Sequence, residues 1–164
     1  MATLKTPVKE SLGRMQLEHK AELTDLLNQQ LANLSDLYSQ TKFSHWNVNG
    51  SNFIAVHKLF DELAEEVEEA IDEVAERLAA MGGVARGTTR MAAEHSQLEE
   101  FPDGDFDSMT VLENLAEAFG RTGNLVRDAI KQADELDDAG TVDLLAQTSR
   151  MLDESLYFLE SHGV

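Results

Sequence analysis

Residues 43–61 read FSHWNVNGSNFIAVHKLFD, and this stretch decides the fold of the chain. The dipeptide Asn49-Gly50 is typical of a tight turn, and Ser51 or Asn52 behind it can cap the start of a helix. Apolar residues recur at helical spacing on both sides of the turn. The stretch therefore predicts two antiparallel helices joined by this turn.

The helical pattern extends outward from the turn in both directions. Apolar residues indicate a first helix over residues 15–47 and a second over 52–81, which a Gly-Gly pair ends. Residues 84–107 then lack a regular pattern, apart from a short helix predicted over 89–95. A long connection therefore follows the first two helices.

Two more helices follow this connection. Thr110 and Glu113 match a capping box and predict a third helix that ends near residue 136, and Thr141 is expected to cap a fourth that ends near residue 163. A long crossover between the second and third helices is the ferritin-like arrangement. The expected fold class is therefore all-α, a ferritin-like four-helix bundle with a short helix in that crossover. Residues 16–164 would form this one domain, and residues 1–15 a loose N-terminal tail.

The composition excludes several classes of protein. Cysteine is absent, which excludes disulfide scaffolds, thiolate metal sites and thiol catalysis. The 31 Asp and Glu residues against 13 Lys and Arg residues give a net charge of −18, so the surface should repel nucleic acid and attract cations. With neither a signal peptide nor an apolar run of membrane-spanning length, we expect a cytoplasmic protein without a membrane partner.

The second predicted helix carries four side chains suited to binding a metal. With His57 placed at 0° and about 100° per residue, Asp61 lies at about 40°, Asp72 at about 60° and Glu76 at about 100°. The apolar stripe of the helix lies about 130° away, so the four do not face the core of their own bundle. A single His–Asp pair is more often a surface salt bridge, and a run of nine acids without a base from Asp61 to Glu76 is typical of a solvated face.

One metal cannot contact all four residues within one chain. His57 and Asp72 are 15 residues apart, which is about 22 Å along a helix. A two-fold, antiparallel pairing of this helix from two chains would bring His57 and Asp61 of one chain to Asp72 and Glu76 of the other, and would create two such sites. Glu68 lies near the proposed axis, where like charges would face each other.

His45 is a further candidate ligand, because antiparallel helices place it level with His57. Two imidazoles with carboxylates suit non-haem Fe(II), and zinc or another divalent metal accepts the same donors. Trp46, the sole tryptophan, either packs at the helix–turn junction or acts as a redox-active ring beside an oxidising metal. The residues alone are thus compatible with two functions, a metal-binding helical scaffold and an iron enzyme.

Four stretches have a specific combination of motifs: FSHWNVNGSNFIAVH at 43–57, DEVAER at 72–77, GGVARGTT at 82–89 and SRMLDESLYFLE at 149–160. In these motifs the chain resembles the Dps family, the ferritin-like DNA-binding proteins from starved cells. The resemblance extends over nearly the whole chain after the first twenty or so residues.

This resemblance implies a ferroxidase that also stores iron and protects against oxidative stress. It implies a homo-oligomer, a hollow dodecamer built from two-fold dimers, that oxidises Fe(II), preferably with hydrogen peroxide, at inter-subunit sites. Ferric mineral would be stored in the cavity. Trp46 would belong to the catalytic residues, and the implied iron ligands are His45, His57 and Asp61 from one subunit with Asp72 and Glu76 from its mate.

The resemblance also implies acidic three-fold pores near the start of the last helix, for which the candidates are Asp134, Glu135, Asp138 and Asp143. The alternative function is a nucleoid-associated structural shell that binds DNA with little ferroxidase turnover. Residues 1–20 hold four bases and two acids, which must overcome a charge of −18 per chain. We therefore expect weak or absent DNA binding at physiological salt.

Overall fold

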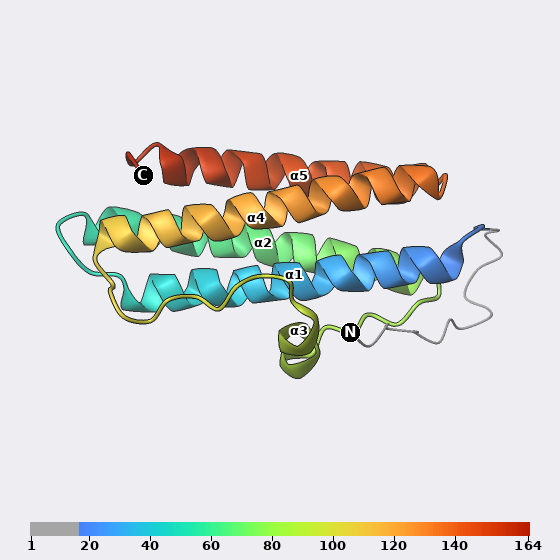
Figure 1. Ribbon diagram of the computed structural model, residues 1–164, viewed down its shortest axis with the longest axis horizontal. Coiled ribbons are helices and arrows are strands. Elements are labelled where there is room, and N and C mark those ends of the chain that lie inside the picture. The colour runs from blue at the N-terminus through green and yellow to red at the C-terminus, as the bar shows by residue number, and fades with distance from the viewer. Residues whose placement is uncertain (1–16) are drawn as a thin grey trace.

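The computed structural model describes residues 17–164 and contains five helices: α1 (Lys20–Asn47), α2 (Phe53–Ala80), α3 (Thr89–His95), α4 (Ser108–Glu135) and α5 (Ala139–Glu160) (Figure 1). Within these residues the only β-type pairing is an isolated bridge between Asn49 and Asp107. The predicted all-α bundle with a short helix in its crossover is therefore confirmed. The predicted tail, residues 1–15, lies outside the described residues.

The four long helices form two antiparallel hairpins, α1–α2 and α4–α5, while the crossover carries α3 along the outer side of α1 (Figure 1). The core between them is aliphatic, with the rings of Phe60 and Phe119 fully buried at its centre. The predicted apolar stripe of α2 faces this core, so the opposite face of α2 is free for polar chemistry. None of the helices in residues 17–164 is long and apolar enough to cross a membrane.

The turn between α1 and α2 is fastened to the start of α4. Gly50 has a φ of 112°, and a Cβ at this position would lie 3.0 Å from Asp107 Oδ1. The backbone N–H of Asn49 donates to Phe106 O at 2.9 Å. Both facts favour glycine in the turn, because a larger residue would be strained in this conformation and would push the α4 cap away.

Amide side chains of α1 hold the crossover against the bundle. Gln29 Nε2 donates to His95 O at 2.8 Å, and Gln40 Nε2 donates to Glu99 O at 3.0 Å. These bonds satisfy backbone carbonyls that an irregular segment would otherwise leave unpaired. The long crossover is thus tied to α1 at the last residue of α3 and again four residues later.

Two predicted helix starts are wrong in detail. α4 begins two residues before Thr110, because the Asp107 carboxylate accepts from a backbone N–H of the first turn and caps the helix. α5 begins at Ala139 rather than after Thr141, because the left-handed residue Asp137, with a φ of 54°, separates α4 from α5. The other predicted boundaries agree with the structure to within a few residues.

Candidate metal centre

His45, in the last turn of α1, and His57, early in α2, face each other across the α1–α2 hairpin. Their rings are stacked, with centroids 3.9 Å apart and an interplanar angle of 19°. His45 Nδ1 donates to His57 O at 2.7 Å, and His57 Nδ1 donates to His45 O at 2.8 Å. The structure thus places the two imidazoles at one level, as the predicted antiparallel hairpin requires.

These reciprocal bonds determine the tautomer of both rings. A carbonyl oxygen can only accept, so each neutral ring must carry its proton on Nδ1. The lone pair then lies on Nε2 of both His45 and His57, which is the form in which imidazole binds a metal. A hydrogen bond from Nδ1 to a backbone carbonyl is also the usual way in which a ligating histidine is oriented.

Asp61 follows His57 by one turn of α2 and lies beside Lys42 of α1. Its Oδ1 is 3.8 Å from His45 Nε2 and 2.5 Å from Lys42 Nζ. The hydrogen bond from Lys42 holds the pKa of Asp61 below its ordinary value, and the same bond raises the pKa of Lys42. The Asp61 carboxylate is therefore already paired with the ammonium group of Lys42.

Lys42 is the member of this cluster that sequence reasoning missed. It lies three residues before His45, so the two share one face of α1. That spacing is the signal that could have identified it. A search restricted to metal-ligand residue types excludes lysine, because an ammonium group has no lone pair to offer.

Asp72 and Glu76 lie on the exposed face of α2, well beyond the histidine pair. Within residues 17–164 of one chain, the His, Asp and Glu side chains form no group of three or more that could hold a metal. Glu68, between the two sets, is exposed as well. A single chain thus presents the predicted residues as two separate sets, and their union across two chains remains a prediction.

The donors of the first set fit iron chemically. The two Nε2 lone pairs and the Asp61 carboxylate combine neutral nitrogen with anionic oxygen, the mixture that non-haem Fe(II) accepts. Zinc accepts the same donors. Since residues 17–164 of one chain do not by themselves bring three such side chains together around a metal, a complete site would also need the carboxylates of a second subunit.

Trp46 follows His45 directly, and its ring is 68% exposed. It lines the same groove as Lys42, between α1 and α3. Within one subunit little of Trp46 is covered, and its predicted packing at the helix–turn junction remains a prediction. Its predicted redox role remains a prediction.

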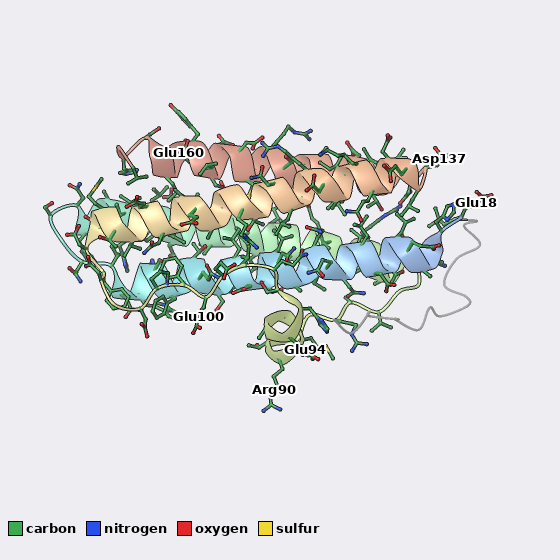
Figure 2. The ribbon with its side chains drawn as sticks, viewed as in Figure 1. Glu18, Arg90, Glu94, Glu100, Asp137 and Glu160 are labelled. Carbon is green, nitrogen blue, oxygen red and sulfur yellow. The ribbon has the colours of Figure 1, made fainter. Side chains whose placement is uncertain are left out.

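The four candidate pore acids lie around the turn between α4 and α5, the end of the bundle that Asp137 marks in Figure 2. Asp134, Glu135 and Asp143 are exposed there. Asp138 is only 7% exposed, and its carboxylate accepts hydrogen bonds from Arg77 and Thr141. The structure therefore corrects Asp138 from a free pore carboxylate to a buried partner of an arginine.

The environment of Asp138 stabilises its ionised form. Burial alone would raise its pKa, but hydrogen bonds from Thr141 and Arg77, together with the charge of Arg77, outweigh burial and hold the pKa below its ordinary value. Arg77 Nη2 lies 2.8 Å from Oδ2 and 3.0 Å from Oδ1. This ion pair joins the end of α2 to the start of α5.

Comparisons with known proteins agree with this fold. Residues 24–163 match the family model of the ferritin-like domain. The chain is 37% identical, over 87% of its own length and 88% of the relative's, to the "DNA protection during starvation protein" of Agrobacterium fabrum. Among solved structures, DpsC from Streptomyces coelicolor superposes with a TM-score of 0.88 at 33% identity, over 96% of this chain and 92% of that one.

Another solved structure is informative about the metal chemistry of the superfamily. The Dps protein of Vibrio cholerae, described as a member of a broad superfamily of ferritin-like diiron-carboxylate proteins, superposes with a TM-score of 0.81 at 25% identity, covering 91% of this chain and 98% of that one. From its fold, its motifs and these similarities, the chain belongs to the ferritin-like proteins and, among them, to the Dps family.

Proposed function

We propose that the chain is a ferroxidase and iron-storage protein. It oxidises Fe(II), preferably with hydrogen peroxide, at sites between two subunits, and it stores ferric mineral in a hollow dodecamer built from two-fold dimers. The observation that carries this proposal is the reciprocal bonding of His45 and His57, which leaves the Nε2 lone pair of each ring available, that of His45 being 3.8 Å from Asp61 Oδ1. Membership of a family with diiron-carboxylate relatives supports the same chemistry.

The complete site needs two subunits. His45, His57 and Asp61 supply one half, and the partner's Asp72 and the partner's Glu76 supply the other. An antiparallel pairing of α2 about a two-fold axis satisfies this requirement at two places at once. On its own subunit the first half is partly exposed and the second half is exposed, so pairing would cover both without rebuilding the bundle.

The residues divide the chemistry between them. The carboxylates favour Fe(III) over Fe(II), because hard anionic oxygen stabilises the higher charge. The imidazoles add neutral donors of fixed direction. Each Fe(II) gives up one electron, and one hydrogen peroxide takes up two electrons and two protons to become two water molecules. Removing Fe(II) and peroxide together prevents the formation of hydroxyl radicals, which is a protective role.

Iron entry and storage depend on charge at a distance from the site. Asp134, Glu135 and Asp143 are exposed near the α4–α5 turn and would attract Fe(II) to a pore at that end of the subunit. Asp138 is excluded from this role because Arg77 already neutralises it. A chain with a net charge of −18 would also concentrate cations where its acidic faces enclose a cavity.

The test uses one variant in each half of the site. His57→Asn keeps an N–H that can donate to His45 O but removes the Nε2 lone pair, and Asp72→Asn removes one carboxylate charge of the other half. Each variant alone should lose most peroxide-driven Fe(II) oxidation, followed as ferric absorbance. Circular dichroism and light scattering establish that both variants fold and assemble as the wild type does.

Co-assembling the two variants tests whether the site is shared. A mixed two-fold dimer holds one site with both defects and one site with neither, so refolding the variants together should recover activity. Activity that does not recover would place each site within one subunit, and unchanged rates in both single variants would remove the ferroxidase proposal. Metal analysis of the purified protein separates iron from zinc or another divalent metal.

Protection or binding of DNA is the second candidate function, because curated relatives are named for DNA protection during starvation. The net charge of −18 opposes direct binding, since every phosphate contact needs a cation from the protein. We expect no stable gel shift at ~150 mM salt, the range in which such contacts are strongly weakened. A tight complex at that salt would favour the nucleoid-associated shell.

A further inference from the structure

Lys42 occupies the carboxylate that the proposed iron site needs. Its Nζ lies 2.5 Å from Asp61 Oδ1, while His45 Nε2 lies 3.8 Å from the same oxygen. A metal bound between His45 Nε2 and this Oδ1 would approach the oxygen that the ammonium group now contacts. Since an ammonium group donates but has no lone pair, it cannot stay as a ligand of that metal.

The ammonium group is able to leave. The Lys42 side chain is 21% exposed, and it lines the open groove between α1 and α3 together with Tyr38 and Trp46. A four-carbon stem with free rotations lets its charge move into solvent while the methylene groups stay on the protein surface. The Asp61 side chain is 46% exposed, so the contact can be broken without opening the core.

Within residues 17–164, no other lysine or arginine forms an ion pair with Asp61. Residues 61–76 of α2 contain nine acids and no base. Arg77, which follows them, is engaged with Asp138. Lys58 lies on α2 close to the site, but its side chain is exposed and makes no ion pair within residues 17–164.

We propose that Lys42 is the resident counter-ion of the iron site, which incoming Fe(II) displaces from Asp61. This inference rests on the proposed function and adds a regulation of the same site. In the empty site the lysine neutralises a carboxylate that two-fold pairing would bring close to the partner's Asp72 and the partner's Glu76. Iron binding is then an exchange of one cation for another, and its affinity is lowered by the strength of the lysine contact.

Anaerobic calorimetry with Fe(II) tests the exchange, because binding is measured without turnover. Lys42→Met removes the charge and keeps an unbranched side chain of similar length. We expect it to bind Fe(II) about fivefold more tightly, the upper range for a partly exposed ion pair. Lys42→Arg keeps the competing charge and should bind no more tightly than the wild type.

Lys58→Met is the matched control, since it also removes one positive charge close to the site. If displacement governs the affinity, this variant should stay within about twofold of the wild type, as for a solvent-screened charge. Equal tightening in both methionine variants, or none in Lys42→Met, overturns the role of Lys42 and leaves the proposed function standing. A wild-type protein that binds no Fe(II) overturns the proposed function itself.

Discussion

Two cation–carboxylate pairs join α2 to its neighbours, one near each end of the helix, and they are built differently. Lys42 and Asp61 share one contact, and their side chains are 21% and 46% exposed. Arg77 and Asp138 are 23% and 8% exposed, and Arg77 Nη2 contacts both carboxylate oxygens. Thr141 closes the second pair by donating to Asp138 and accepting from Arg77 Nε.

This difference separates a structural pair from an exchangeable one. The Arg77–Asp138 pair has a buried carboxylate and is closed by three hydrogen bonds to it, so a metal would have to break existing bonds to bind there. The Lys42–Asp61 pair is open to solvent and rests on one bond, so another cation can replace the lysine. A high density of acids on α2 therefore does not by itself identify ligands, because the partner of each carboxylate decides its role.

The largest expected effect comes from breaking the closed pair. Arg77→Met leaves the buried Asp138 without its cation, which should cost about 3 kcal/mol of unfolding free energy. Urea denaturation at fixed protein concentration measures the change. Arg127→Met is the matched control, because Arg127 pairs with Asp153 where both side chains are about half exposed, and it should cost less than about 1 kcal/mol. Equal losses would contradict the distinction.

The closed pair also predicts a dependence on pH. The pKa of Asp138 is lowered in the folded protein, so the stability that it contributes is present above the unfolded value of about 3.9 and is lost as the pH falls through the folded value. The stability difference between wild type and Arg77→Met should thus be full at neutral pH and shrink below about pH 4. Thermal unfolding across pH 3–7 checks this, and a difference independent of pH would refute it.

Glu66, which forms no ion pair within residues 17–164, sharpens the comparison further. Burial raises the pKa of Glu66, and the hydroxyl of Ser155, 3.2 Å away, offsets this only partly. That hydroxyl also lies 2.9 Å from Met151 O and has one proton to donate. Glu66→Gln should therefore stabilise the protein at neutral pH, by about 0.5 kcal/mol.

The sign of this effect follows from the raised pKa. The folded state penalises the ionised form of Glu66, so the penalty is present at neutral pH and disappears once acid protonates the group. Glu69→Gln, on the exposed face of the same helix, is the control. Thermal unfolding at neutral and acidic pH compares the two variants, and a destabilised Glu66→Gln at neutral pH would contradict the prediction.

The open pair is expected to contribute little to stability. Asp61→Asn removes a partly exposed contact, so the unfolding free energy should fall by less than about 1 kcal/mol. The same variant should lose most of its Fe(II) affinity, measured by anaerobic calorimetry. A large loss of stability with intact iron binding would reverse the roles assigned to the two pairs.

The sequence predicted the helices well because their signals are local. The period of the apolar residues and the Asn49-Gly50 turn depend on neighbours in the chain, and helix α3 was predicted over the same residues that form it. The cap of α4 was assigned to Thr110 instead of Asp107, since two acceptable capping residues lie close together there. Local patterns thus define elements more reliably than their first residues.

The contacts of the candidate site were harder to predict because they join distant positions. The level of His45 with His57 followed from the hairpin, but the hydrogen bonds that determine both tautomers needed coordinates. Lys42 and Arg77 reach Asp61 and Asp138 from other elements, and the spacing of Lys42 and His45 shows a shared face of α1 without showing the contact with Asp61. Helical angles place a side chain on a face without naming its partner.

The hydrogen bonds between each imidazole and the other histidine's carbonyl couple two features: the register of α1 against α2 and the direction of the two Nε2 lone pairs. If α1 slid along α2 by even one residue, both bonds would break together and both Nε2 atoms would turn aside. When α1 and α2 pair in the correct register, the Nε2 atoms of His45 and His57 therefore already point away from the carbonyls. The backbone of the hairpin thus fixes the orientation of both imidazole rings, and no further side chain is needed to hold it.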